Sequence, residues 1–162
     1  MNIVAAPSSA AGTWEIADTP SVTAYSPQSE HFELELPSEP DSVTRAREAM
    51  GTLARRLGAS VDDVKIAVTE AVGNSVLHAF RDREPGTITL DARSDRDWLV
   101  IRVSDDGSGM VPNIDSPGLG IGISLITRAA FDVRFDSSKS GTSVRMAFAI
   151  PARSDREEVP DG

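Results

Sequence analysis

The sequence predicts an α+β fold, a two-layer sandwich in which helices cover one face of a mixed, mostly antiparallel sheet. Three observations support it. A strand pattern near residue 32 precedes two segments with the apolar spacing of helices, and a hairpin pattern follows them. Near the end of the chain, an apolar helix pattern is followed by two more strand patterns. Helices grouped with antiparallel strands pack as two layers around one core.

Length and composition indicate a single acidic domain. The chain has 162 residues, of which 40% are hydrophobic, and a formal net charge of −9. This is enough for one globular core. The negative charge argues against nucleic acid, which is bound through a basic patch. Cysteine is absent and the histidines are only His31 and His78. Disulfides and thiolate sites are therefore excluded, and a bound metal should be a hard ion.

The two ends of the chain differ in composition from its middle. Residues 1–30 and 152–162 lack apolar periodicity, and we expect a flexible leader and a flexible tail around a folded domain at residues 31–151. The first residues have no basic segment of the kind that opens a signal peptide. No run approaches the roughly 18 apolar residues of a membrane span. We expect a cytoplasmic protein that contacts no membrane.

The first strand and helix are predicted from alternation and from caps. In HFELEL, Phe32, Leu34 and Leu36 alternate with glutamates, which is typical of a strand with one wet face. A capping box at Ser38 and Asp41 then predicts a helix that ends at Gly58. Its apolar residues step by three and four: Val43, Ala46, Met50, Leu53 and Leu57.

The remaining elements follow the same rules. A second helix is predicted from a cap at Ser60, with Asp63 three residues on, through Phe80. TITLDAR and WLVIRVSD form a predicted hairpin joined through residues 94–97. GLGIGISLITRAA is a glycine-rich entry into a buried helix. The strands FDVRFD and TSVRMAFAI, joined by a turn at SSKSG, complete the domain.

Two polar side chains are predicted to point inward at strand ends. Strand side chains alternate, so Asp105 shares a face with the apolar residues Ile101 and Val103. By the same parity, Thr142 shares a face with Val144. A buried carboxylate is costly unless it accepts hydrogen bonds. Asp105 therefore has an internal partner or binds a ligand.

Two further patterns lie on the predicted helices. Glu70, Asn74 and His78 recur every four residues as a polar stripe on the second helix, which on its own is usually a solvated face. Gly73 beside them indicates that something approaches the backbone. The glycines of GLGIG, residues 118–122, open a helix whose free N–H groups favour phosphate. Their spacing matches neither a dinucleotide fingerprint nor a P-loop, and a flexible hinge is the alternative.

Together these pieces resemble a known superfamily. EAVGN (70–74), DDGSG (105–109), GLGIG (118–122) and GT (141–142) resemble, in order, the N, G1, G2 and G3 boxes of the GHKL, or Bergerat-fold, ATPases. Within that superfamily the chain is similar to the anti-sigma-factor serine kinases of the RsbW and SpoIIAB type. The resemblance covers roughly residues 32–150.

The resemblance implies ATP or ADP with Mg²⁺ as ligands. Asp105 would accept a hydrogen bond from the adenine amino group, supported by Thr142, and Asn74 would bind Mg²⁺. Glu70 would be the general base. Other residues of the implied nucleotide site are His78, Gly107, Gly109, Met110, Gly118, Leu119, Gly120, Ile121 and Gly122. A lone helix histidine such as His78 is more often structural.

The resemblance also implies partners and leaves alternatives. Arg45 would contact a partner, although an exposed helix charge is an equal interpretation. The first hypothesis is an anti-sigma factor that binds a sigma factor as a homodimer and phosphorylates a STAS-domain anti-sigma-factor antagonist. The second is a nucleotide-responsive binding module without kinase activity. A histidine-kinase catalytic domain ranks third, because we expect no phosphoacceptor helix before the domain and expect His31 in an unstructured approach to a strand.

One segment departs from the pattern of the superfamily. The loop VPNIDSP, residues 111–117, contains no Lys or Arg, whereas the ATP lid of such proteins commonly supplies a basic group to the γ-phosphate. Adenine binding is unaffected by this departure, but kinase activity depends on another cation. Arg81, Arg128 and Lys139 are the candidates.

Overall fold

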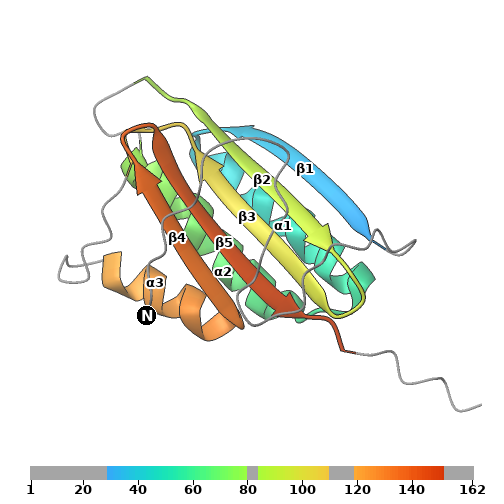
Figure 1. Cartoon of the computed structure of the whole chain (residues 1–162). Helices are drawn as coiled ribbons and strands as arrows, with labels where there is room; N and C mark the ends of the chain where they lie inside the picture. The colour runs from blue at the N-terminus through green and yellow to red at the C-terminus, as the bar shows by residue number, and fades with distance from the viewer. Residues whose placement is uncertain (1–28, 80–83, 110–118, 152–162) are drawn as a thin grey trace, which may run out of the picture.

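The computed structural model describes residues 29–79, 84–109 and 119–151 (Figure 1). These residues form one sheet with the strand order β1-β2-β3-β5-β4, in which every pair is antiparallel. The elements are β1 (Glu30–Pro37), α1 (Pro40–Leu57), α2 (Val61–Asn74), the π-helix η1 (Ser75–Ala79), β2 (Thr87–Ser94), β3 (Trp98–Asp105), α3 (Leu119–Ala129), β4 (Asp132–Ser138) and β5 (Gly141–Ala149).

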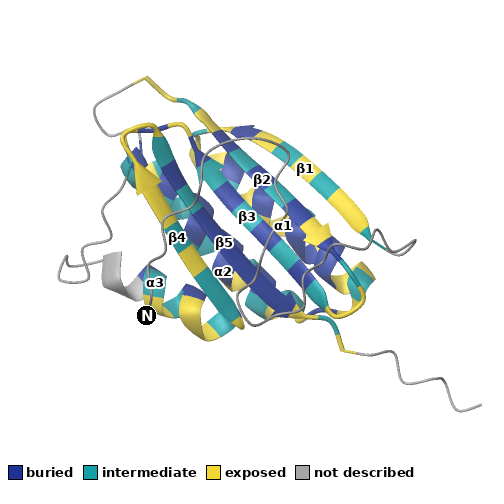
Figure 2. Ribbon diagram, in the orientation of Figure 1, coloured by how far each residue is buried: buried dark blue, intermediate teal, exposed yellow. Residues whose placement is uncertain are grey.

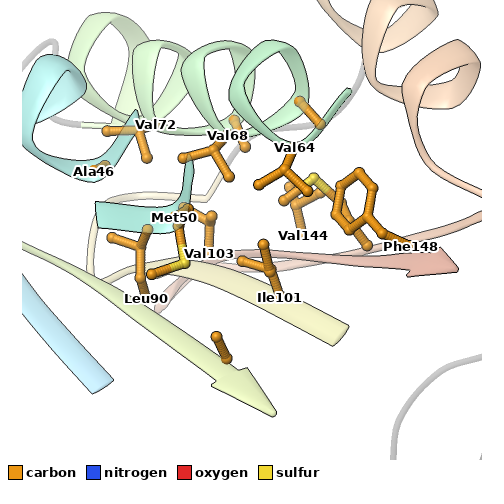
Figure 3. Packing of buried hydrophobic residues seen from close by; sticks show 14 of the residues in the cluster. Ala46, Met50, Val64, Val68, Val72, Leu90, Ile101, Val103, Val144 and Phe148 are labelled. Atoms are coloured by element: carbon orange, nitrogen blue, oxygen red, sulfur yellow. The ribbon is translucent and has the colours of Figure 1, made fainter. Parts of the chain in front are cut away.

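The helices lie on one face of the sheet, and this arrangement confirms the predicted two-layer α+β fold (Figure 1). Buried residues gather between the two layers, where α2 packs over β3 and β5 (Figures 2 and 3). Val64 and Val68 of α2 and Ile101 and Val103 of β3 are all at most 1% exposed. Burial of such side chains contributes about 1.5–3 kcal/mol each.

Alternation predicted β2 and β3 correctly because each of these strands has one buried face. Ile88, Leu90 and Ala92 of β2 point into the core, as do Leu99, Ile101 and Val103 of β3. β1 begins at Glu30, one residue before the predicted start of the domain. The predicted leader, up to residue 28, and the tail lie outside the described residues.

The start of α1 differs from the prediction. Glu39, and not Ser38, is the N-cap residue, and no side chain caps the helix. Pro40 occupies the first turn, where its fixed φ suits a helix start, and so displaces the predicted capping box. The hydroxyl of Ser38 is buried with no hydrogen-bond partner in the described part of the chain. The predicted end at Gly58 is confirmed, with a φ of 84° that glycine adopts without strain.

The second helix begins as predicted but changes type before it ends. The hydroxyl of Ser60 accepts a hydrogen bond from the amide of Asp63 at 3.4 Å, as the cap requires. The α-helix stops at Asn74 and continues as the π-helix η1, whereas the sequence predicted one α-helix through Phe80, itself outside the described residues. Single π turns inside helices are frequent at functional sites. No described atom lies within 4 Å of a Cβ built at Gly73, so the close approach expected there is not made by the described residues.

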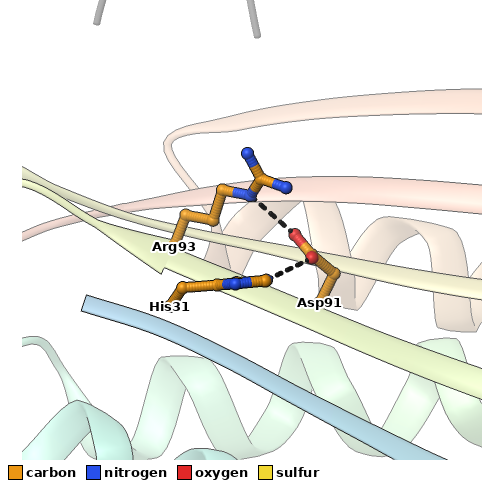
Figure 4. A network of polar contacts seen from close by, with 3 residues as sticks. All are labelled: His31, Asp91 and Arg93. Carbon is orange, nitrogen blue, oxygen red and sulfur yellow. Dashed lines mark hydrogen bonds and ion pairs between the residues drawn. The ribbon is translucent and has the colours of Figure 1, made fainter. Parts of the chain in front are cut away.

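His31 lies within β1 and not in an unstructured approach to it. Its Nε2 atom is 2.7 Å from Oδ2 of Asp91 on β2 (Figure 4). The other oxygen of Asp91 accepts a hydrogen bond from Nε of Arg93 at 3.2 Å. These three side chains lie on the face of the sheet opposite the helices. In the described residues, no helix is long and apolar enough to cross a membrane.

Candidate functional site

Asp105 ends β3 with its carboxylate inside the protein, as parity predicted. Asp105 is only 8% exposed. Its Oδ1 atom accepts hydrogen bonds from the backbone amides of Gly107 and Thr142, both at 3.1 Å. Its Oδ2 atom accepts a hydrogen bond from the hydroxyl of Ser75 at 2.8 Å. Three donors from three different elements of the chain therefore fix the orientation of this carboxylate.

The three donors leave part of the carboxylate available. An ionised carboxylate offers about four acceptor positions, and the described donors occupy one on Oδ2 and two on Oδ1. The remaining position lies on Oδ2. A ligand that brings an N–H donor to this oxygen would complete its hydrogen bonds, whereas a ligand carbonyl would face a negative charge. The geometry suits an exocyclic amino group such as that of adenine.

The loop after Asp105 packs closely against η1. A Cβ at Gly107 would lie 2.3 Å from the carbonyl oxygen of Ala79, a distance that real side chains do not show. The same carbonyl accepts hydrogen bonds from the backbone amide of Ser108 at 3.0 Å and from its hydroxyl at 3.3 Å. The last residue of the π-helix is thus attached to the loop that begins with the buried carboxylate.

The neighbouring carboxylate has a different role. Asp106 is exposed, and its Oδ1 atom accepts a hydrogen bond from the backbone amide of Thr87 at 2.9 Å. It therefore stabilises the start of β2. Of the two adjacent carboxylates, only Asp105 points into the site.

Two glycines with positive φ connect the site to the turn between β4 and β5. Gly109 has φ 76°, and a Cβ there would lie 1.8 Å from the carbonyl oxygen of Ser138. Gly141 has φ 135°, and its Cβ would lie 1.9 Å from the carbonyl oxygen of Asp105. Both positions need glycine for backbone conformation and for space.

We expect Gly141→Ala to lower the free energy of unfolding by about 2 kcal/mol, because it adds both strain and a backbone clash. Chemical denaturation measures this loss. Gly58→Ala is the control, because Gly58 also has a positive φ, 84°, but nothing within 4 Å of its Cβ. It should cost about 1 kcal/mol. Equal losses in the two variants would contradict the importance of the contact with Asp105.

The second half of the site lies where α2 meets the first turn of α3. A Cβ at Gly122 would lie 2.8 Å from Oε2 of Glu70 and within 3.6 Å of both side-chain atoms of the Asn74 amide. Gly122 is buried between these groups. The first amides of an α-helix have no partner within the helix and carry a partial positive charge. A carboxylate, an amide oxygen and the amino end of a helix are therefore brought together here.

The remaining predicted site residues lie in several different elements of the fold. Thr142 is only 7% exposed and donates its backbone amide to Asp105. His78 is half-buried in η1 and no longer continues the α-helical stripe of Glu70 and Asn74. Arg45 is exposed on α1. Leu119, Gly120 and Ile121 form the start of α3, and Met110 and Gly118 lie outside the described residues.

The lid residues 111–117 also lie outside the described residues, as does Arg81. Of the other two cations that could replace a lid cation, Arg128 is in the last turn of α3, about 9 Å along the helix from Gly122. Lys139 lies in the turn between β4 and β5, next to the residue whose carbonyl contacts Gly109. Lys139 is therefore on the Asp105 side of the site.

A family model described as the histidine kinase-like ATPase domain matches residues 36–148. The chain belongs to this family. In the structure of this chain, the four predicted motifs lie around one site. Two of them lie at strand ends and two where α2 meets α3. Membership of this family implies that the domain binds ATP.

Individual relatives of this histidine kinase-like ATPase domain are named as a serine-protein kinase and as an anti-sigma factor. A serine-protein kinase RsbW of Listeria innocua is 44% identical over 78 residues, which are 46% of this chain and 50% of that protein. An anti-sigma F factor of Clostridium beijerinckii is 30% identical over 128 residues, which are 68% of this chain and 88% of that protein. The chain spans about half the length of the RsbW kinases that it matches.

A solved structure shares the fold of this ATPase domain. The crystal structure of the RsbU and RsbW domains of a Mycobacterium tuberculosis protein superposes with a TM-score of 0.60 at 18% sequence identity. The match covers 76% of this chain and 34% of that chain. At this identity the similarity concerns the fold alone.

Sequence reasoning missed Ser75 in this ATPase domain. Ser75 is only 6% exposed, begins η1 and donates its hydroxyl to the carboxylate of Asp105. A polar residue directly after Asn74 and before the apolar Val76 and Leu77 was the available signal. The interpretation of an α-helical stripe passed over it, because Ser75 lies off the line of Glu70 and Asn74.

The residues present fit a nucleotide with a hard metal ion. Mg²⁺ prefers oxygen ligands and bridges phosphate groups, and the amide oxygen of Asn74 is such a ligand. Gly122 leaves space against Glu70 and Asn74 that any larger residue would fill. At the other part of the site, the described donors leave one acceptor position of Asp105 open. The donor set therefore suits an adenine base at Asp105 and phosphates near the start of α3.

Proposed function

We propose that the chain is an ATP-dependent anti-sigma factor and serine/threonine protein kinase of a partner-switching pathway. It binds a sigma factor and phosphorylates a STAS-domain antagonist of that anti-sigma activity, with Mg²⁺ at Asn74 and as a homodimer. The observation that carries the proposal is the buried Asp105 carboxylate, held by three donors with one acceptor position open, in a chain related to RsbW kinases and anti-sigma F factors.

The proposed mechanism uses the two parts of the site differently. When bound, Mg·ATP supplies the phosphoryl group and a cation that offsets phosphate charge. Asp105 accepts a hydrogen bond from the adenine amino group and so selects the base. Glu70 accepts the proton of the incoming serine hydroxyl. The serine oxygen bonds to the γ-phosphorus of ATP as the bond from that phosphorus to the β-phosphate oxygen breaks, and ADP leaves. Because Gly122 has no side chain, Glu70 can lie beside the amino end of α3. The first amides of that helix orient the phosphates.

The exposed Arg45 on α1 is proposed to contact a protein partner. It lies on α1, whereas the other residues of the proposed site lie on α2, η1, α3 and the strand ends. Arginine is well suited to such contacts because its guanidinium binds carboxylates in a bidentate manner.

A phosphoryl-transfer assay tests the proposed function. The full chain is incubated with labelled Mg·ATP and a STAS-domain protein. Label on a serine or threonine of that protein supports the kinase. A chain that binds neither adenine nucleotide nor any sigma factor or STAS-domain protein would contradict the proposal.

The second candidate is a regulatory module that binds ATP or ADP without transferring phosphate. The absence of Lys and Arg from residues 111–117 favours it, because phosphoryl transfer depends on positive charge near the γ-phosphate. Adenine-nucleotide binding together with unlabelled STAS-domain proteins would support this candidate. The histidine-kinase alternative remains third.

A further inference from the structure

The outer face of β1 and β2, opposite the helices, carries three side chains of metal-binding type. His31 and Glu33 are two residues apart on β1, so both point to this face. Asp91 of β2 lies directly opposite Glu33 in the register of the two strands. A ring nitrogen of His31 and one carboxylate oxygen of each acid all lie within 4.8 Å of one another. Strand alternation and register thus bring a mixed nitrogen and oxygen donor set together.

The negative charge of this cluster is only partly balanced. Arg93 is 3.2 Å from Oδ1 of Asp91 and offsets that carboxylate (Figure 4). The carboxylate of Glu33, in contrast, makes no hydrogen bond or ion pair with any described residue. Like charges directly opposite each other destabilise a sheet, and Glu33 and Asp91 form such a pair. A cation held by both carboxylates would replace this repulsion with attraction.

We propose that His31, Glu33 and Asp91 bind a divalent transition-metal ion, with Zn²⁺ as the best match to the donor set. Three protein ligands leave the fourth position of a tetrahedral zinc ion to water. Zinc ligands lie about 2.0–2.2 Å from the ion, which places neighbouring ligand atoms about 3.4 Å apart. The contact of 2.7 Å between Nε2 of His31 and Oδ2 of Asp91 therefore opens slightly, and the wider separations close. Because His31 and Glu33 are exposed, small side-chain rotations are enough.

The imidazole of His31 selects the class of metal. Imidazole nitrogen suits zinc, nickel and copper ions, whereas Mg²⁺ and Ca²⁺ are bound by oxygen ligands. The ion proposed here therefore differs from the Mg²⁺ proposed at Asn74. The two places are also separate, because Asn74 ends α2 on the other face of the sheet. The zinc site does not rest on the proposed function.

The surroundings of Asp91 orient it as a ligand. Carboxylates that bind metal ions are themselves hydrogen-bonded by outer residues, which fix their orientation. Arg93 donates its Nε–H to Oδ1 of Asp91 and so leaves Oδ2 on the side of His31. β1 is at the edge of the described sheet, where it pairs with β2 alone. An ion bound by His31, Glu33 and Asp91 would therefore attach this edge strand to its neighbour.

Isothermal titration calorimetry of the full chain with ZnCl₂ tests the site, with excess Mg²⁺ present to occupy sites for hard ions. We expect one Zn²⁺ per chain. His31→Gln and Glu33→Gln should each raise the dissociation constant at least about tenfold, because even changes to residues that only orient a ligand cost about 10–100-fold in metal affinity. Glu35→Gln is the matched control. It removes an exposed carboxylate from the same face of β1, outside the cluster, and should leave zinc binding unchanged.

Thermal unfolding gives a second readout. ZnCl₂ should raise the unfolding midpoint of the wild type and of Glu35→Gln but not that of His31→Gln. The shift with Mg·ADP should be equal in all these variants, so loss of the zinc site and loss of nucleotide binding are distinguished. A wild type that binds no Zn²⁺ overturns the proposal. Zinc binding that either His31→Gln or Glu33→Gln leaves unchanged overturns it as well, because the ion is then held by other residues.

Discussion

Asp105→Asn should abolish the stabilisation of the protein by adenine nucleotides. In the variant the amide oxygen still accepts from Gly107 and Thr142, and the Ser75 hydroxyl can turn to accept from the new amide nitrogen. The fold is therefore kept. However, an amide N–H replaces the open acceptor position and faces the adenine amino group. We expect affinity for ATP and ADP to fall about 10- to 150-fold, since hydrogen bonds to charged groups contribute about 1.5–3 kcal/mol.

Thermal unfolding with Mg·ADP measures this loss. At a ligand concentration of about 100 times the dissociation constant, the wild type gains about 2.7 kcal/mol of stability. A variant that binds 100-fold more weakly gains only about 0.4 kcal/mol at the same concentration. Mg·GTP should not stabilise the wild type, because the guanine carbonyl would face the Asp105 carboxylate.

Asp106→Asn provides the matched control for this experiment. It removes a carboxylate from the adjacent residue, which is exposed and holds the start of β2 through the amide of Thr87. Its shift with Mg·ADP should equal that of the wild type. If Asp105→Asn also keeps the full shift, Asp105 does not contact the base, and its burial serves only to connect Ser75, Gly107 and Thr142.

The part of the site that depends on strand parity could be predicted from the sequence. Side chains alternate strictly along a strand, so the apolar residues before Asp105 fixed the direction of its carboxylate. The same alternation correctly paired Thr142 with the core face of β5. The glycine-rich start of α3 could also be predicted from the sequence. At Gly122, which packs against Glu70, only glycine fits the available space.

Other features depend on details that periodicity does not contain. The capping box at Ser38 was a reasonable prediction, but Pro40 set the helix start and left Glu39 as the cap. The π turn after Asn74 changes the face of each later residue, so neither the contact of Ser75 with Asp105 nor the place of His78 followed from an α-helical pattern.

Glu70→Gln should separate phosphoryl transfer from nucleotide binding. Glutamine preserves the size of the side chain that lies beside Gly122, so the packing of α2 on α3 is kept. It cannot accept the proton of an incoming serine hydroxyl. We expect the rate of phosphate transfer to a STAS-domain protein at saturating ATP to fall about 10²–10⁴-fold, while the thermal shift with Mg·ADP stays near that of the wild type.

Asp62→Asn is the control for Glu70→Gln, because it removes an exposed carboxylate from the first turn of the same helix. It should retain the full transfer rate. A Glu70→Gln protein that phosphorylates at the wild-type rate would show that Glu70 is not the general base. If the wild type itself transfers no phosphate yet shifts with Mg·ADP, the absence of Lys and Arg from residues 111–117 is decisive. The chain is then a nucleotide-responsive module, because Asp105 selects adenine without any contribution from Glu70.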